Sequence, residues 1–312
     1  MNYYPYFRGK QYELLCIKEN ADLLSKSGFS PIIEPVKNDI GSLLRCLTEV
    51  EKCGGRAFVV SNPNCGSLKA GLPQDFRQKL AALIDGSLGI SWIYGIQGVE
   101  GGVLNGLSEN VALLHDRSAD ASLIKSVAVR AGVGLNPNIF IDAKDSGTLY
   151  RKHFGGGARI LVRDGFQKKK NSDYIDPDIE HFSDLHLTYQ EEGMTGFGDF
   201  LTVGDDYSEG GGPAYAVAIH LTFVDSDRDS SMFIHHFVSD SNLTPADPAG
   251  KFSEALSKLA SAVRKIDSKI FQTAAVKEFL DLHDRGHYPG LGYVKKLSMQ
   301  HHIELMAEIG HE

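Results

Sequence analysis

Charged, amide and imidazole side chains lie at the end of almost every short apolar run in the first 164 residues of this 312-residue sequence. The residues at these positions are Arg8, Lys10, Glu34, Asn62, Gln97, His115, Asp142, Lys144, Arg163 and Asp164. Arginine and lysine bind phosphate or carboxylate groups, and arginine does so with two parallel hydrogen bonds. Interleaved carboxylates can act as general acid and base or as oxygen ligands of a divalent cation. Brought together, these groups suit phosphoryl or phosphodiester chemistry.

Within this set, we expect the acids Glu34, Asp142 and Asp164 to supply the catalytic carboxylates. We expect the other members to bind the ligand: Arg8, Lys10, Asn62, Gln97, His115, Lys144 and Arg163. A divalent cation is a candidate cofactor for such carboxylates. No HExxH motif for zinc occurs, and the HDRGH pair of histidines at 283–287 is interrupted by the helix-breaking Gly286. The alternative is structural, because the same charges can pair with one another in a neutral network of salt bridges.

The stretch GDDYSEGGGPAYAVAIHLTF at 204–223 joins a polar loop to an apolar run through three consecutive glycines. It lacks the GxxxxGK[ST] spacing, and its glycines precede a strand instead of a helix, which excludes a Walker-type phosphate loop. We interpret the glycines as a hinge that brings Tyr207, Ser208 and Glu209 toward a bound ligand. A bend that only begins a β-hairpin is the alternative.

The elements that must position these residues alternate along the chain as an apolar run, a polar turn and a helix-like stretch. The apolar runs lie at 3–7, 30–36, 56–62, 91–97, 111–116, 138–143, 158–164 and 198–204. Most are continuous, which is typical of parallel strands covered on both faces. Eight strand–helix units without a change of rhythm predict an α/β fold, a (β/α)8 TIM-like barrel whose loops converge at one rim. A doubly wound sheet shares this local pattern and is the alternative.

Two regions depart from the alternation. The segment 205–248 holds two apolar runs separated by the polar VDSDRDS, which predicts a β-hairpin inserted after the eighth strand. The alternative is that this segment holds the true last strand together with a partner strand. A helix is expected at 250–266, and two further helices are expected in a C-terminal extension at 267–312. We therefore expect residues 1–312 to form a single barrel domain.

Composition limits the class of protein. The formal net charge is −8, so the chain as a whole is not built to coat nucleic acid or an anionic membrane. The 4 cysteines form no CxxC pair and suit a reducing compartment. The N-terminus lacks the basic and apolar regions of a signal peptide, and no apolar stretch approaches the length of a membrane span. We expect a cytoplasmic protein without a membrane partner.

Several stretches resemble the Beta-protein family of phage and bacterial proteins, and in particular its shorter bacterial members. The stretches are YYPYFRGKQYELL, PIIEPV, FSDLH, GFGDF, YSEGGGPAYAVAIHLTF, DPAGKF and HYPGLGYVKKLSMQHHIELM. The resemblance spans almost the whole chain. Genes of this family lie in mobile or defence-associated regions, often beside a small putative nuclease. The resemblance thus implies a role in phage defence or in a toxin–antitoxin-type pair, with a nuclease as protein partner, and it transfers no catalytic residue.

Two functions follow from these observations. In the first, the barrel mouth binds a phosphate-bearing ligand, such as a nucleotide or a nucleic-acid end, and acts on it as a phosphodiesterase or another hydrolase. In the second, the chain is a non-catalytic, antitoxin-like partner of a nuclease and uses aromatic residues of the HYPGLGY stretch as interface anchors.

Overall fold

The fold was analysed in a computed structural model that describes residues 1–99, 101–107, 110–210 and 212–310. The chain divides into two compact units. The first unit holds residues 1–164 and 185–200, and the second holds residues 165–184 and 201–312. The expectation of a single domain stays a prediction. None of the described helices combines the length and the apolar character that crossing a bilayer requires.

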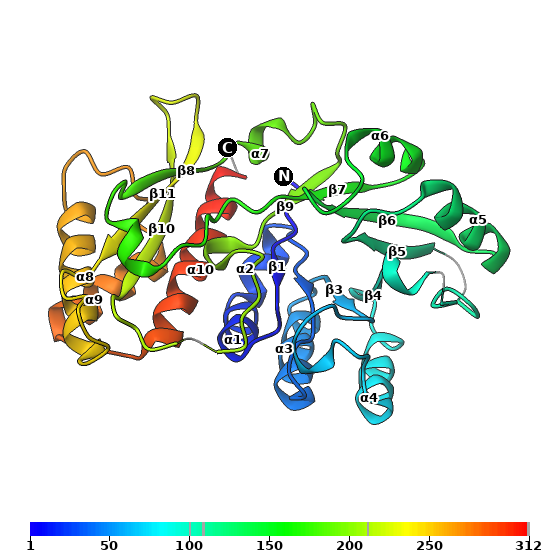
Figure 1. The fold of residues 1–312 in the computed structure, drawn as a ribbon, viewed down its shortest axis with the longest axis horizontal. Helices are drawn as coiled ribbons and strands as arrows, with labels where there is room; N and C mark the ends of the chain where they lie inside the picture. The colour runs from blue at the N-terminus through cyan, green and yellow to red at the C-terminus, as the bar shows by residue number, and fades with distance from the viewer. Residues whose placement is uncertain (100, 108–109, 211, 311–312) are drawn as a thin grey trace. The chain divides into compact units, whose positions relative to one another are not determined.

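The first unit is built on an eight-stranded, all-parallel sheet with the order β1-β2-β3-β4-β5-β6-β7-β9. Its strands are β1 (Tyr6–Phe7), β2 (Ile32–Ile33), β3 (Ala57–Val60), β4 (Ile90–Gly95), β5 (Asn110–His115), β6 (Gly134–Ile141), β7 (Arg159–Val162) and β9 (Gly196–Gly198). Figure 1 shows the strands β3 to β7 side by side in this order. The predicted α/β, TIM-like fold is confirmed at this level.

The sheet curls into a nearly closed barrel, because its last strand returns to the segment around β1. The amide of Tyr4 donates to the carbonyl of Phe197 at 2.8 Å, and the amide of Tyr6 donates to that of Asp199 at 2.9 Å. A glycine is required at Gly198, where a Cβ atom would lie 2.0 Å from the carbonyl oxygen of Tyr4. The absence of a side chain there lets the two edges approach.

Helices connect these strands. They are α1 (Gln11–Glu19), α2 (Ala21–Lys26), α3 (Ile40–Lys52), α4 (Gln74–Ile84), α5 (Ala121–Ala131), α6 (Thr148–Arg151) and α7 (Leu185–Thr188), with 3-10 turns η1 (Gly66–Leu68), η2 (Ile96–Gly98) and η3 (Lys152–Phe154). Helix α3 shows why they form: Asp39 caps it by accepting from the amide of Ser42 at 3.2 Å. Its Leu43, Leu47 and Val50 are buried on one face.

The core of the first unit is a cluster to which every strand or its flank contributes alternate residues. It contains Tyr6, Ile32, Val60, Ile93, Ala112, Leu114, Ile139, Ile141, Ile160, Val162 and Phe200. Because successive side chains of a strand point to opposite faces, these residues define the face that fills the barrel. The opposite face carries further buried residues, such as Leu113, Phe140 and Leu161.

The second unit contains a three-stranded antiparallel sheet with the order β10-β11-β8. Its strands are β8 (Ile179–Ser183), β10 (Ala218–Asp225) and β11 (Ser231–Val238), and its helices are α8 (Pro248–Val263), α9 (Ala274–Arg285) and α10 (Leu291–Ile309), with turns η4 (Asn171–Tyr174) and η5 (Leu201–Val203). Leu221, Leu256 and Phe279 belong to a separate core between this sheet and these helices.

Two sequence-based assignments are wrong in detail. The eighth barrel strand was expected at 198–204, but β9 ends at Gly198 and a 3-10 turn follows at Leu201–Val203. The alternation predicts a helix between the seventh and eighth strands, but 179–183 forms β8 and only the short α7 follows. The second difference has a tertiary cause: residues 179–183 form a strand because they pair with β11, which lies about 50 residues further along the chain.

Candidate functional site

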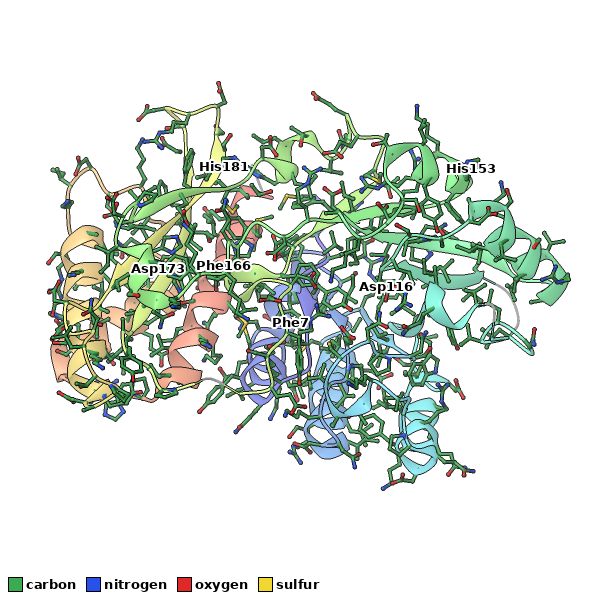
Figure 2. The ribbon with its side chains drawn as sticks, viewed as in Figure 1. Phe7, Asp116, His153, Phe166, Asp173 and His181 are labelled. Carbon is green, nitrogen blue, oxygen red and sulfur yellow. The ribbon has the colours of Figure 1, made fainter. Side chains whose placement is uncertain are left out.

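The alternation that fills the barrel continues past the strand ends. Two residues beyond Tyr6, Ile32, Val60, Leu114 and Val162 in the core lie polar residues. These are Arg8, Glu34, Asn62, Asp116 and Asp164. Since alternate residues share a face, these side chains belong at the carboxyl rim of the barrel, where barrel enzymes place their active sites. Figure 2 labels Asp116, which follows β5.

Arg8 and Glu34 form a buried ion pair at this rim. A guanidinium nitrogen of Arg8 contacts Glu34 Oε2, and the two side chains are 11% and 2% exposed. The hydroxyl of Tyr6 donates to the same oxygen at 2.9 Å. The guanidinium also lies 5.1 Å from the ring centroid of Tyr6 and 5.3 Å from that of Phe200. Two strand ends that are 26 residues apart in the chain thus hold one cation and one carboxylate in a fixed orientation.

Asn64 links Glu34 to a second carboxylate, Asp116. The backbone amide of Asn64 donates to Glu34 Oε1 at 2.6 Å, and its side-chain amide donates to Asp116 Oδ2. The thiol of Cys65 lies 3.4 Å from Glu34 Oε1. A single loop residue therefore holds two carboxylates from different strands side by side.

Arg117 adds a half-exposed cation to this arrangement. Its Nε lies 3.7 Å from Asp116 Oδ1, and its side chain is 51% exposed. Its Nη2 donates to Gln97 Oε1 at 2.6 Å and to Asn64 Oδ1 at 3.1 Å. We refer to Arg8, Glu34, Asn64, Asp116 and Arg117 as the rim cluster.

Asp116 has the most unusual carboxyl group of the rim cluster. Burial is the main cause that raises its pKa to about 6; Glu34 acts in the same direction, while Arg117 and Lys144 oppose the shift. Its side chain is 7% exposed. Among the residues that the structure describes, no hydrogen-bond partner reaches its buried Oδ1 atom. An acidic group of this kind changes its protonation near neutral pH, and its Oδ1 atom is buried without a hydrogen bond to any described residue, 3.7 Å from Arg117 Nε.

The side chains of Asn62 and Gln97 form hydrogen bonds with other residues of the rim. The side chain of Asn62 pairs with the backbone of Gly95, donating at 3.0 Å and accepting at 2.8 Å. Gln97 donates to the carbonyl of Asn62 at 2.7 Å and accepts from Arg117. Both residues therefore position Arg117 and the ends of β3 and β4.

Asp142 and Arg163 lie in a different group, which we name the outer network. Arg163 Nε donates to Asp142 Oδ2 at 2.5 Å, and Arg151 of α6 donates to Asp142 Oδ1 at 2.6 Å. Arg151 also contacts Asp145, and Arg163 contacts Glu192, each at 2.7 Å. Burial raises the pKa of Asp142, but the hydrogen bonds and charges of Arg151 and Arg163 outweigh burial and lower it. This is the self-neutralising arrangement of the structural alternative.

His115 is part of the helix-facing core. It is fully buried, its Nδ1 lies 2.7 Å from the hydroxyl of Tyr150 and its Nε2 lies 3.0 Å from Asn138 Oδ1. Its ring stacks on Phe140 at 4.4 Å. Burial lowers its pKa to about 4, so it is neutral at neutral pH. The strand alternation separates it from its neighbour Asp116.

The remaining rim residues of the first unit are more exposed. Lys10 directly precedes α1 and is part-exposed. Lys144 is exposed after β6 and acts electrostatically on Asp116. Asp164 is exposed after β7. The structure thus places Lys144 close enough to act on the charge of Asp116. Asp164 is placed at the rim only because it lies two residues beyond Val162, on the same strand face.

The glycine-rich stretch belongs to the second unit. Tyr207 is part-exposed, and Ser208 and Glu209 are exposed. Within the same unit, Lys168 donates to the carbonyl of Asp206 at 3.0 Å and so ties down the start of the stretch. The middle glycine, Gly211, lies outside the described residues. The proposed hinge therefore stays a prediction.

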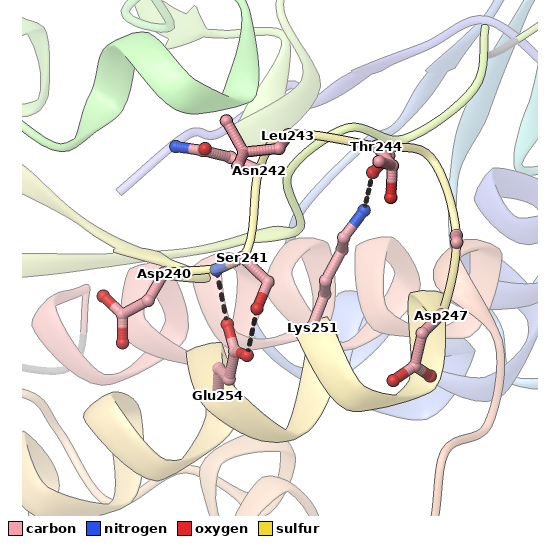
Figure 3. Close-up of a pocket in the computed structure, with 9 residues that line it drawn as sticks. Asp240, Ser241, Asn242, Leu243, Thr244, Asp247, Lys251 and Glu254 are labelled. Carbon is pink, nitrogen blue, oxygen red and sulfur yellow. Dashed lines mark hydrogen bonds between the residues drawn. The ribbon is translucent and has the colours of Figure 1, made fainter.

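A cavity of about 490 Å³ lies in the second unit, under the loop that precedes α8 (Figure 3). Polar groups that line the cavity form hydrogen bonds between this loop and α8. Glu254 accepts from the amide and hydroxyl of Ser241 at 2.8 and 2.6 Å, and buried Lys251 donates to the carbonyl of Thr244. Asp247 caps α8 by accepting from the amide of Gly250 at 2.9 Å. We regard this cavity as a consequence of loop anchoring.

Sequence reasoning assigned no site role to three members of the rim cluster, Asn64, Asp116 and Arg117, although Asn64 and Asp116 follow strand ends. The signal for Asp116 was present, because Ala112, Leu114 and Asp116 follow one another at the two-residue period of a strand face. Asn64 and Arg117 lie in loops, where no periodicity applies. No group of three or more metal-ligating side chains is placed to hold an ion within the described ranges.

Comparison with known proteins adds no relative to this picture. No protein-family model, curated protein or solved structure matches the chain. The resemblance to the Beta-protein family stays an expectation from the sequence, and the case for function depends on the geometry of the rim cluster.

Proposed function

We propose that the rim cluster binds a phosphate-bearing ligand, such as a nucleotide or a nucleic-acid end, and hydrolyses a phosphate ester bond in it. The observation that carries the proposal is Asp116, a buried carboxyl group with a pKa of about 6 and one oxygen without a hydrogen-bond partner in the described part of the chain. A general base is most effective when its pKa lies near the working pH. Asp116 is the group that would take a proton from the attacking water.

The neighbouring residues have complementary roles in this proposal. Arg117 is half-exposed and adjacent to Asp116, so its guanidinium can hold a phosphate oxygen. Lys144 adds positive charge to the same region. Glu34 binds Arg8, Tyr6 and Asn64 at once and so fixes the position of Asn64, which orients Asp116. Glu34 is thus a positioning residue, and Asp116 is the proposed catalytic one.

The biological setting in this proposal is the one that the family resemblance implies, phage defence or a toxin–antitoxin-type pair with a nuclease. The competing function, a non-catalytic nuclease partner, would use Tyr288 and Tyr293 as anchors. Both rings pack against the core of the second unit, and the hydroxyl of Tyr293 contacts Glu278. Their contribution to the fold favours the hydrolase as the first hypothesis to test.

The test uses bis(p-nitrophenyl) phosphate as a diester and p-nitrophenyl phosphate as a monoester, each with and without magnesium chloride. We expect Asp116→Asn to lower kcat/KM at least about 100-fold, because the general base is lost. We expect Arg117→Gln to raise KM. In the active protein, kcat/KM should rise with pH and level off above about 6, as Asp116 ionises.

The matched control is Asp142→Asn, which alters a carboxylate of the outer network and should leave KM unchanged. The proposal fails if neither ester is hydrolysed and inorganic phosphate does not raise the melting temperature of the protein. Hydrolysis that survives in Asp116→Asn would remove Asp116 from the mechanism. A catalytically silent protein that binds a nuclease would support the competing function.

A further inference from the structure

A second group of titratable side chains lies in the second unit and is independent of the rim cluster. His220 of β10 and His236 of β11 are direct cross-strand partners. Their Nδ1 atoms lie 2.7 Å apart. The Nε2 atom of His236 lies 3.1 Å from Glu180 Oε2 on the neighbouring strand β8. Three adjacent strands thus place a carboxylate and two imidazoles in one hydrogen-bonded row.

The row determines where the protons are. Glu180 binds Lys169 through Oε1 and His236 through Oε2. A carboxylate that accepts at both oxygens requires a proton on Nε2 of His236. In a neutral His236, Nδ1 then carries a lone pair, so the short contact needs a proton on Nδ1 of His220. The remaining nitrogen, Nε2 of His220, is left with a lone pair.

Aromatic rings hold this arrangement in place. Phe166, labelled in Figure 2, contacts His220 edge-on at 5.1 Å. The ring centroid of Tyr174 lies 4.9 Å from that of His220 and 4.4 Å from that of His236. His236 is 3% exposed, whereas His220 is part-exposed. Among the described residues, no hydrogen bond reaches Nε2 of His220. One end of the row is thus Nε2 of the part-exposed His220, and the other end, Glu180, is occupied by Lys169.

We propose that Glu180, His236 and His220 form a proton relay, and that Nε2 of His220 is a second basic site that takes a hydroxyl-bearing ligand by accepting its proton. When the ligand gives up its proton, the O–H bond breaks and its electron pair stays on oxygen. An N–H bond forms at Nε2 of His220. The proton on Nδ1 of His220 passes to Nδ1 of His236, and the proton on Nε2 of His236 passes to Glu180. One proton enters the row, and Glu180 ends as the neutral acid.

Burial, with a smaller contribution from nearby cations, keeps the histidines of the row neutral. Burial lowers the pKa of His220 well below its usual value, and His236 and Lys295 of α10 act in the same direction. Burial also lowers the pKa of His236 to about 4; Glu180 opposes this shift, and His235 and Lys169 add to it. The lone pair on His220 is thus available at a pH at which an ordinary histidine is protonated.

The first experiment detects the tautomers directly by NMR of the full chain with 15N-labelled histidine. We expect a lone pair on Nε2 of His220 and a proton on Nε2 of His236, with the first signal assigned by its loss in His220→Gln. A proton on Nε2 of His220 in the unmodified protein would overturn the proposal, whatever the variants do.

The second experiment measures reactivity with diethyl pyrocarbonate, which transfers an ethoxycarbonyl group to a neutral imidazole and releases ethanol and carbon dioxide. Between pH 5.5 and 7.5, N-acetylhistidine in the same tube should react about tenfold faster at the higher pH. Modification of His220, followed by peptide mapping, should change less than about twofold because its imidazole is already neutral. A tenfold rise at His220, or no modification at any pH, would contradict the proposal.

Glu180→Gln tests the carboxylate end of the row. Loss of the carboxylate removes the charged acceptor that fixes His236, so modification of His220 should slow about fivefold. The matched control is Asp178→Asn, which alters a nearby carboxylate that contacts His235 instead of His236. Equal rates in Glu180→Gln and Asp178→Asn would show that Glu180 does not act through the row. The rim cluster is unchanged in every variant, so these outcomes are separate from those of the phosphate-ester assays.

Discussion

At the scale of single residues, Asp116 and His115 show how a strand separates two neighbouring groups. Both are largely buried, yet His115 stacks in the helix-facing core while Asp116 lies with Glu34 at the rim. Burial acts on them in opposite directions, raising the pKa of the acid and lowering that of the imidazole. Near neutral pH, only Asp116 of these two changes its charge.

The pKa of Asp116 predicts a pH dependence of stability. Its folded-state pKa of about 6 exceeds the unfolded value, so its favourable contribution is complete below pH ~4 and is lost as pH rises through about 6. A shift of about two units corresponds to roughly 3 kcal/mol. Asp116→Asn should therefore gain up to roughly 3 kcal/mol relative to wild type on going from pH 4 to pH 8. Urea unfolding at several pH values measures this, with exposed Asp85→Asn as control. Parallel pH profiles for wild type and Asp116→Asn would contradict it.

At the scale of elements, the outer network fastens α6 to β6 and β7. Arg151 is 4% exposed and contacts Asp142 and Asp145, while Arg163 binds Asp142 and Glu192. A buried guanidinium that loses a charged partner is costly, because its desolvation is no longer offset. The network therefore helps to attach a helix of only 4 residues to the strand ends.

Asp142→Asn should lower the free energy of unfolding at pH 7 by about 2 kcal/mol. The folded-state pKa of Asp142 is lowered, so its contribution is present above the unfolded pKa and is lost as pH falls through the folded one. The difference between wild type and Asp142→Asn should accordingly shrink toward acidic pH. Chemical unfolding at pH 7 and at pH 3 measures both effects. An unchanged stability at pH 7 would mean that the network is not energetically important.

At the scale of the whole molecule, each of the two compact units has its own apolar core. The first core fills the barrel, and the second lies between the antiparallel sheet and α8 to α10. Separate cores allow separate cooperative unfolding, because each unit buries its apolar surface internally.

We therefore expect two calorimetric transitions that respond to different substitutions. Gly198→Ala should lower the midpoint temperature of the first unit's transition, since a Cβ atom would lie 2.0 Å from the carbonyl oxygen of Tyr4 at the closure of the barrel. Phe279→Ala should lower the midpoint temperature of the second unit's transition, because the loss of its buried ring costs about 3–5 kcal/mol of packing energy. Gly156→Ala is the control, because an added Cβ would meet no atom within 4 Å. A single transition that both variants shift equally would show that the chain unfolds as one domain.

The sequence by itself determined the eight-strand alternation, because continuous apolar runs and helical periodicity are local features that survive without tertiary information. It also indicated that polar residues gather where strands end. It did not separate Arg8 and Glu34 from Asp142 and Arg163, because that distinction depends on which face of its strand each residue occupies. Only the tertiary structure decided that Asn64 bridges Glu34 to Asp116, and that 179–183 is a strand. Both depend on partners distant in sequence, which no local pattern encodes.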